Sequence, residues 1–348
     1  MTRFGYSLLG IAYSLRSIIA VGAALVVGVG LVILAGGNPL QAYAALFSGA
    51  FLDYWGFAST LVRMAPILLA GLAVIIPMRA GLFNIGGEGQ IYMGALMGTL
   101  AALNLPETIP LAVRLPVIVL AGACAGGLWA LIPAVLKAYR GVNEVISSLL
   151  LSYVAINVVG AVIRSLLMEK GAPFPYSKEV PADVILPVLL PQTQVHAGVA
   201  AAIVLALCIA IVLKRTTFGL AIEIVGHNPT SARYAGINIK RMIMTSFFVG
   251  GSLAGLAGVF EVIGLRYRLF DQFSPGYGLQ GIIVAFLASL NPLIAIITAL
   301  FLAGLQAGAG SMQRTTGLDT TMVEALQGLI VLFVAVGLAF RQWRRPSS

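Results

Sequence analysis

Charged residues are scarce in this sequence: they make up 9% of the 348 residues, while 59% are hydrophobic. A soluble domain averages about 25% charged residues, because its surface must be solvated by water. So few charges cannot cover a water-soluble surface of this size. The composition therefore predicts an all-α, polytopic transmembrane bundle of about ten segments, with crossings of about 20 apolar residues each.

Cysteine, histidine and nucleotide-binding motifs are also scarce or missing. The two cysteines, Cys124 and Cys208, fall inside apolar segments, which argues against a disulfide or a metal site. No Gly-x-x-x-x-Gly-Lys-Ser/Thr phosphate loop and no His-Glu-x-x-His motif occurs. The stretch Gly250-Gly251-Ser252-Leu253-Ala254 lacks the second glycine of a serine nucleophile elbow. We therefore predict no catalytic residue, no metal site and no cofactor on this chain.

Ten apolar segments follow one another along the chain, and we interpret them as membrane segments. The eighth has only about twelve residues, too few to cross a bilayer as a helix alone. We expect it to be one half of a broken or re-entrant helix, with irregular chain completing the crossing. The segments are 17–36, 60–78, 81–103, 113–136, 145–166, 195–213, 242–264, 278–289, 293–308 and 321–340.

Lysine and arginine are distributed as orientation signals. The net charge is +9, but the basic residues lie at the ends of apolar runs and form no compact cluster that would indicate nucleic acid. With the N-terminus inside, the inner loops hold 13 of the 21 basic residues: Arg3, Arg16, Arg79, Lys137, Arg140, Lys214, Arg215, Arg233, Lys240, Arg241, Arg341, Arg344 and Arg345. This bias predicts a single domain over 1–348 with both termini in the cytoplasm. If the eighth segment is re-entrant instead, the C-terminus lies outside.

The predicted loops on the two sides differ in character. The longest outer loop, 167–194, contains five prolines and is expected to form an irregular cap. The largest inner loop is 214–241. Arg63 and Arg164 lie near outer ends of predicted helices, where a long side chain can extend along the helix toward water.

The most informative stretch is 79–95, RAGLFNIGGEGQIYMGA. It places Asn84, Glu88 and Gln90 among glycines inside an apolar region. Polar groups at bilayer depth are costly and mark transport pathways, while glycines allow a helix to break and backbones to approach closely. We expect these three side chains to line or gate a substrate pathway; ordinary helix packing is the alternative.

A second stretch, 273–287, reads FSPGYGLQGIIVAFL and also places a Gly-x-Gly unit before an apolar run. Gly87-Glu88-Gly89 can be aligned with Gly276-Tyr277-Gly278, and paired glycine-interrupted segments point to a pathway at the membrane midplane. An internal duplication is one hypothesis from this pairing. Tyr277 and the deeply placed Glu261 join the predicted pathway.

The inner loop contains a short helix signal. Asn228 suits a helix N-cap and Pro229 the first helical position, while Gly236 suits the residue just after a helix end. A helix of about two turns does not persist alone, so we expect it to dock on a partner; lying on the lipid headgroups is the alternative. The predicted coupling residues are Gly226, Asn228, Pro229, Ala232, Tyr234 and Gly236.

Three segments resemble the permease subunits of ABC importers for nucleosides, within the branched-chain amino acid and ribose permease superfamily. They are GLFNIGGEGQIYMGAL (81–96), VGHNPTSARYAGI (225–237) and SPGYGLQGIIVAFL (274–287). The similarity runs in order from Gly-Asn-Pro at 37–39 to the last segment, and the chain looks like the longer of two paired permeases. The resemblance implies a multi-pass inner-membrane subunit that transports by alternating access and is not an enzyme.

The resemblance also implies partners. They are a second homologous permease, a cytoplasmic ATPase with two nucleotide-binding domains that carries ATP and Mg, and an extracytoplasmic substrate-binding lipoprotein. The helix near 229–235 matches the family's coupling helix. An importer of simple sugars or branched-chain amino acids is an alternative function. An ion-coupled secondary carrier is another alternative. Such a carrier should hold paired acids inside the membrane, and Glu88 and Glu261 are the only deep pair in this sequence.

Overall fold

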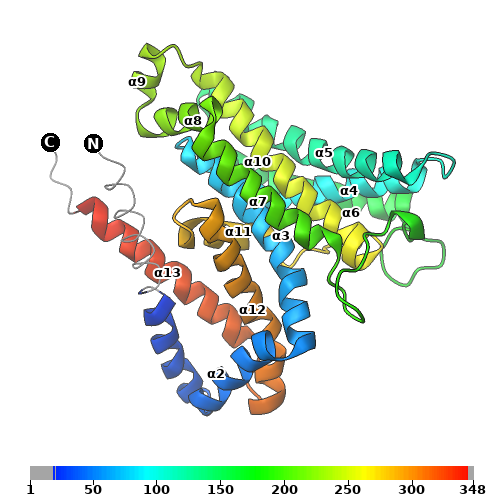
Figure 1. Ribbon diagram of the computed structural model, residues 1–348, viewed down its shortest axis with the longest axis vertical. Helices are drawn as coiled ribbons and strands as arrows, with labels where there is room; N and C mark the ends of the chain where they lie inside the picture. The colour runs from blue at the N-terminus through cyan, green and yellow to red at the C-terminus, as the bar shows by residue number, and fades with distance from the viewer. Residues whose placement is uncertain (1–18, 20, 344–348) are drawn as a thin grey trace.

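The structure is a computed structural model that describes residue 19 and residues 21–343 (Figure 1). Within these residues every regular element is a helix, and the extended chain forms only three isolated bridges. The α-helices are Val21–Leu34, α2 (Pro39–Phe47), α3 (Tyr54–Arg79), α4 (Gly87–Asn104), α5 (Leu111–Arg140), α6 (Glu144–Val162), α7 (Ala197–Arg215), α8 (Thr217–His227), α9 (Pro229–Tyr234), α10 (Ile239–Glu261), α11 (Tyr277–Leu287), α12 (Pro292–Thr316) and α13 (Thr321–Trp343). Short π-helical turns at Ser48–Leu52, Ile163–Leu167 and Val262–Arg266 and a 3₁₀ turn at Ala182–Val184 complete the set.

Six of these helices are long and apolar enough to cross a bilayer: α3, α5, α6, α7, α10 and α12. Helices α6 and α10 are counted together with the π turns that follow them. The chain is therefore an integral membrane protein. A helix overlaps each of the ten predicted segments, although ten crossings remain a prediction. The third segment was placed too early, because the chain over 80–86 is irregular and α4 begins only at Gly87.

Helix α3 lies at the centre of the bundle. Figure 1 shows α4, α5, α6, α7 and α10 on one side of it and α2, α11, α12 and α13 on the other. In its apolar window 83% of the residues are buried, against 28% for α7. After the turns that carry Ser59 and Arg63, the helix is apolar all round up to its last residue, Arg79, as expected of a helix surrounded by protein.

Small residues set the packing of α10 against α4 and α5. A Cβ atom added to Gly94 would lie 2.3 Å from the Cα atom of Gly255, and one added to Gly126 would lie 2.4 Å from the carbonyl oxygen of Gly251. Lipid tails give apolar helices no hydrophobic reason to associate, so close backbone contact supplies the attraction. These glycines therefore explain why three helices pack as a compact group.

The chain breaks between α10 and α11. Helix α11 has 11 residues, a length of about 16 Å at 1.5 Å per residue, and irregular chain over 267–276 precedes it. At the other end of α11, the Arg79 Nε atom donates a hydrogen bond to the Leu290 carbonyl at 2.9 Å, so this end lies beside the end of α3. Helix α11 thus ends beside the end of α3, and its first residue, Tyr277, shares a cavity with Arg63. A membrane crossing by the eighth segment remains a prediction.

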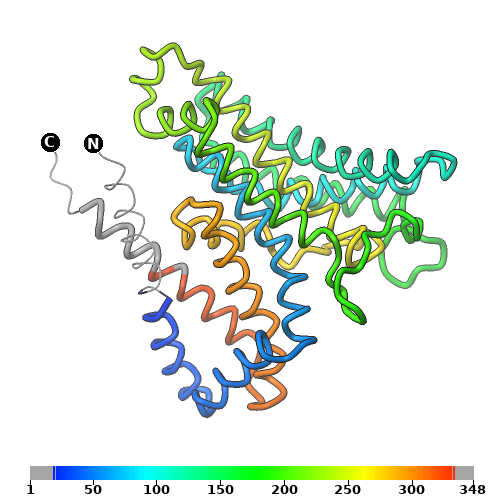
Figure 2. Tube along the Cα trace, in the orientation of Figure 1, coloured from blue at the N-terminus to red at the C-terminus, as the bar shows by residue number. Residues whose placement is uncertain are grey.

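The two ends of the bundle differ. Figure 2 shows α8 and α9 projecting from the end opposite the chain over 168–196. Helix α8 was not predicted, because eleven residues between basic segments resemble a loop in sequence; Thr216 caps it by accepting a hydrogen bond from the Gly219 N–H at 3.3 Å.

At the opposite end, chain over 168–187 runs beside the segment that leads into α11. The N–H groups of Ser177 and Val180 donate to the carbonyls of Leu269 and Tyr267, both at 2.9 Å. Ion pairs join Arg268 to Glu169 and Glu179, Arg164 to Asp271, and Arg114 to Asp183. Arg164 thus pairs with a carboxylate of the protein, whereas the sequence suggested only extension toward water.

Candidate functional site

The first turns of α4 and α11 meet inside the bundle. The Gly278 N–H donates a hydrogen bond to the Glu88 Oε2 atom at 2.7 Å. A Cβ atom at position 278 would lie 2.3 Å from the Glu88 nitrogen, so only glycine allows this approach. Helix N-termini carry partial positive charge and unsatisfied N–H groups. The Glu88 carboxylate therefore lies where two such ends converge and links the two broken segments.

Asn84 and Gln90 hold the irregular chain that leads into α4. The amide of Asn84 donates to Gln90 Oε1 at 3.1 Å, and the amide of Gln90 donates to Asn84 Oδ1 at 3.0 Å. Asn84 is fully buried and Gln90 is 1% exposed. The two side-chain amides bond to each other, and this pairing positions the start of α4. Their place on a substrate pathway remains a prediction.

Two serines of α6 support the same segment. Ser148 Oγ accepts a hydrogen bond from the Ile85 N–H at 3.1 Å, and Ser152 Oγ accepts one from the Gly89 N–H at 3.2 Å. These bonds satisfy backbone groups that the break in the helix leaves without intrahelical partners. The sequence analysis missed both serines, because only the fold brings α6 against this chain.

Glu261 and Tyr277 form a second polar cluster with Arg266. The Arg266 Nε atom donates to Glu261 Oε1 at 2.9 Å, and the Tyr277 hydroxyl lies 3.4 Å from the same oxygen. Glu261 is 3% exposed, and Arg266 lies in the π turn that ends α10. A buried carboxylate is tolerated when it is paired and hydrogen-bonded in this way. The pair therefore anchors the first residue of α11 to the end of α10.

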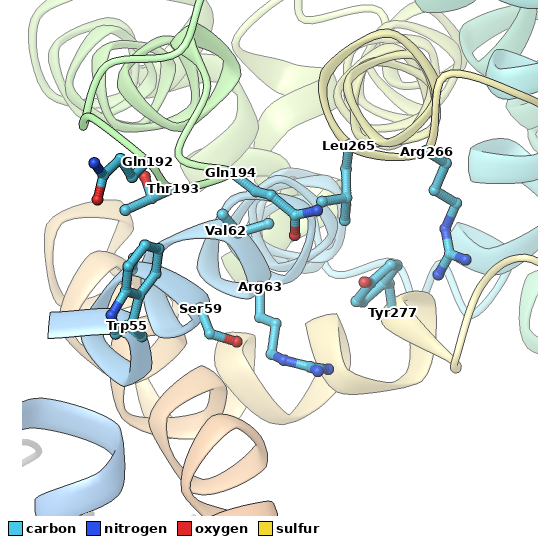
Figure 3. Close-up of a pocket in the computed structure, with 11 residues that line it drawn as sticks. Trp55, Ser59, Val62, Arg63, Gln192, Thr193, Gln194, Leu265, Arg266 and Tyr277 are labelled. Atoms are coloured by element: carbon cyan, nitrogen blue, oxygen red, sulfur yellow. The ribbon is translucent and has the colours of Figure 1, made fainter. Parts of the chain in front are cut away.

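A cavity of about 390 Å³ lies beside this cluster (Figure 3). Its volume falls in the range of small-molecule sites, about 300–1,000 Å³. Tyr277 is the predicted pathway residue that lines it, and Glu261 lies behind the wall through its bond to Tyr277. The lining residues are Trp55, Ala58, Ser59, Val62, Arg63, Gln192, Thr193, Gln194, Leu265, Arg266 and Tyr277.

Arg63 is the main residue that the sequence analysis misplaced. It turns into the cavity, and its Nε atom is buried without a hydrogen-bond partner among the described residues. A charge inside a membrane segment is itself a signal of function; the position near a helix end led us to interpret it as a side chain reaching for water. Trp55 and Gln194 carried no comparable signal, because their side chains are common at membrane surfaces and in loops.

A second cavity, of about 770 Å³, adjoins the first. The two share Trp55 and Ser59. Asp53 and Arg314 line the second cavity together with Ser48 and Ser311. Such polar side chains are costly against lipid. This side of α3 and α12 therefore faces water or another protein chain.

The predicted helix of the inner loop is present as α9. Asn228 Oδ1 accepts hydrogen bonds from the N–H groups of Thr230 and Ser231 at 2.9 and 3.1 Å. Gly236 has a φ of 77°, and the Ile237 N–H donates to the Ala232 carbonyl at 3.0 Å, which closes the helix in a Schellman motif. The predicted helix and both of its end signals are confirmed.

The residues of this loop divide into packed and exposed ones. A Cβ atom at Gly226 would lie 2.0 Å from the Arg79 carbonyl oxygen, so α8 packs directly on the end of α3. Arg79 also pairs with Glu223 of α8, with 3.5 Å between Nη1 and Oε1. Ala232 is fully buried, whereas Tyr234 is 90% exposed. The loop is thus firmly attached to α3 and presents Tyr234 outward.

Apolar helices that break beside a polar cavity are typical of a membrane permease. A model of the branched-chain amino acid transport system/permease component family matches residues 56–335. The chain belongs to this family. No solved structure matches the chain.

Three curated relatives cover most of the chain. A glucose ABC transporter permease protein of Haloferax volcanii is 35% identical over 96% of this chain and 90% of its own length. A guanosine ABC transporter permease protein of Bacillus subtilis is 31% identical over 95% of both chains. A nucleoside ABC transporter permease protein of Lactococcus lactis is 31% identical over 92% of this chain and 90% of its own.

The described residues contain no group of three metal-binding side chains. Cys124 and Cys208 are both free and exposed on α5 and α7.

Proposed function

We propose that this chain is the transmembrane permease of an ATP-binding-cassette importer for nucleosides. The observation that carries the proposal is the similarity to guanosine and nucleoside permeases over 95% and 92% of the chain. The matched region, residues 56–335, contains the contact of Glu88 with Gly278, helix α9 and every lining residue of the first cavity except Trp55. A simple-sugar importer is the second candidate, favoured by the 35% identity to the Haloferax volcanii glucose permease.

The mechanism we propose is alternating access without chemistry on this chain. Helices α4 and α11 begin inside the bundle and touch through one hydrogen bond. A small rotation of α11 would separate the two first turns and open the pathway toward α9. The pathway residues in this proposal are Asn84, Glu88, Gln90, Glu261 and Tyr277. Asn84 and Gln90 act by holding α4, and Tyr277 meets the solute in the cavity.

The energy would come from a separate ATPase that carries ATP and Mg. Helix α9 is the proposed docking element, because it is too short to be stable alone and exposes Tyr234 at its surface. Arg79 and Gly226 connect the loop to α3. A movement of α9 would therefore reach the helix at the centre of the bundle. The coupling residues in this proposal are Gly226, Asn228, Pro229, Ala232, Tyr234 and Gly236.

The remaining partners are a second permease and an extracytoplasmic binding lipoprotein. Two Bacillus subtilis guanosine permease proteins match this chain, at 31% and 26% identity, which supports a pair of different permeases in one importer. The polar side of α3 and α12 would face this second permease. The complex would lie in the inner membrane, with both termini of this chain in the cytoplasm.

Uptake by the reconstituted complex tests the function. The chain would be co-expressed with the second permease, ATPase and binding protein of its own organism and placed in proteoliposomes. We expect ATP-dependent uptake of radiolabelled inosine or adenosine, and none of glucose or leucine. Uptake of glucose alone would establish the second candidate. Uptake that needs an ion gradient and no ATP would make the chain a secondary carrier.

A further inference from the structure

Arg63 carries a positive charge that the rest of its surroundings leave unbalanced. It lies nine residues after the first residue of α3, about 13 Å along the helix axis. Glu261 lies behind the cavity wall, where it is bonded to Tyr277, and it is already paired with Arg266. No ion pair to Arg63 occurs in the part of the chain that the structure describes.

The charges around the cavity can be counted. Arg63 and Arg266 line it, and Glu261 lies behind Tyr277, so two positive charges face one negative charge. Asp53 and Arg314 line the neighbouring cavity, and their opposite charges add nothing to the net charge. Asp53 also accepts a hydrogen bond from the Gly56 N–H at 2.8 Å. One positive charge at Arg63 is therefore left to interact with whatever occupies the first cavity.

The other walls favour a flat, acceptor-bearing solute. Figure 3 shows the Arg63 side chain extending to the side of the cavity where Tyr277 lies, with Ser59 beside it and Trp55 on the opposite side. Trp55 and Tyr277 offer aromatic rings against which a planar group can pack. A guanidinium group offers only donors, in a rigid fork that matches two acceptors side by side. The combination suits a heteroaromatic ring with adjacent oxygen and nitrogen acceptors.

We infer that Arg63 contacts the transported solute in this cavity and selects nucleosides whose base carries an oxo group beside a ring nitrogen. The inference rests on the proposed function and makes it more specific. A 6-oxopurine presents O6 and N7 as adjacent acceptors, which arginine and lysine can both bind. Adenine presents N7 beside an amino group. That amino group is a donor, and it cannot accept a hydrogen bond from the guanidinium group.

Arg63→Gln gives the sharpest test, because glutamine pairs with the N6 and N7 atoms of adenine. The complex would be reconstituted with saturating binding protein, and the rates of inosine and adenosine uptake compared. The same binding protein delivers both solutes to every variant, so its own preference cancels between variants. We expect the ratio of inosine to adenosine uptake to fall at least about fivefold in Arg63→Gln and to remain close to wild type in Arg63→Lys.

A second variant and a control complete the test. Ser59→Asp places a carboxylate four residues before Arg63 on the same helix face, where it should pair with the guanidinium and lower the same ratio. Lys170→Gln removes an exposed positive charge outside both cavities and should leave the ratio unchanged.

The outcomes separate the two proposals. If the wild-type complex transports neither nucleoside, the proposed nucleoside function is wrong. If it transports inosine and the ratio is unchanged in both Arg63→Gln and Ser59→Asp, the function stands and the assignment of Arg63 is overturned. A uniform loss of both uptake rates in Arg63→Gln would likewise make Arg63 a structural residue.

Discussion

The contact between the first turns of α4 and α11 can be tested with one methyl group. In Gly278→Ala the new Cβ atom would lie 2.3 Å from the Glu88 nitrogen and 2.7 Å from the Glu88 Cα atom, both of them backbone atoms. Ordinary contact begins at 3.4 Å, so the two turns must separate by about 1.1 Å, the difference between 3.4 and 2.3 Å. Overpacking of this kind costs about 1–3 kcal/mol.

The same separation would break the hydrogen bond of 2.7 Å between the Gly278 N–H and Glu88. A hydrogen bond to a charged group contributes about 1.5–3 kcal/mol. The sum, about 2.5–6 kcal/mol, is an upper bound, because the two terms share one displacement. We expect Gly278→Ala to lower the unfolding temperature of the detergent-solubilised complex and to reduce uptake strongly.

The matched control is Gly328→Ala in α13, where an added Cβ atom meets nothing within 4 Å. Both variants would be followed by thermal unfolding in detergent and by uptake in proteoliposomes. If Gly278→Ala unfolds at the wild-type temperature and transports at the wild-type rate, the two helix starts do not meet as described, and the pathway argument fails with them.

Glu88→Gln should assemble normally but transport poorly, since the amide keeps the size and loses the charge between two helix N-termini; normal uptake would remove Glu88 from the site. Gly236→Val, at a φ of 77°, and Pro229→Gly should leave insertion intact and weaken co-purification of the ATPase; unchanged co-purification and uptake in both would exclude α9 as the coupling element. Burial lowers the pKa of His196 from 6.5 to about 4, so unfolding takes up a proton below about pH 6.5 and stability should fall from there toward pH 4; His196→Asn, which keeps a capping acceptor, should flatten this dependence in thermal unfolding scans. Lys178→Cys, in a cysteine-free background, should react with an impermeant thiol reagent in intact cells, and reaction only after lysis would reverse the orientation.

Sequence patterns singled out the two segments that meet in the structure, but they did not show how the segments meet. The segments around Glu88 and Tyr277 were singled out because polar residues and glycines are unusual in apolar surroundings, and the structure brings their helix starts together. The alignment of Gly87 with Gly276 is displaced by one residue, since α4 begins at Gly87 and α11 at Tyr277. An internal duplication remains a hypothesis.

The membrane class and the short helix α9 could both be predicted from the sequence. Both depend on local physics: the cost of charges in lipid holds for any arrangement of helices, and the caps at Asn228 and Gly236 act over a few residues. The pairing of Asn84 with Gln90 was also within reach, because only six residues separate them.

Which polar side chains meet depends on the packing of the whole bundle. Glu88 and Gly278 are 190 residues apart in sequence, and no local pattern states that they share a hydrogen bond. Arg63 looked like a residue at a helix end until the packing of α3 against α10 and α11 placed its side chain in a cavity. A helix position sets the direction of a side chain relative to its own axis, whereas its neighbours depend on how every helix of the bundle is rotated and tilted.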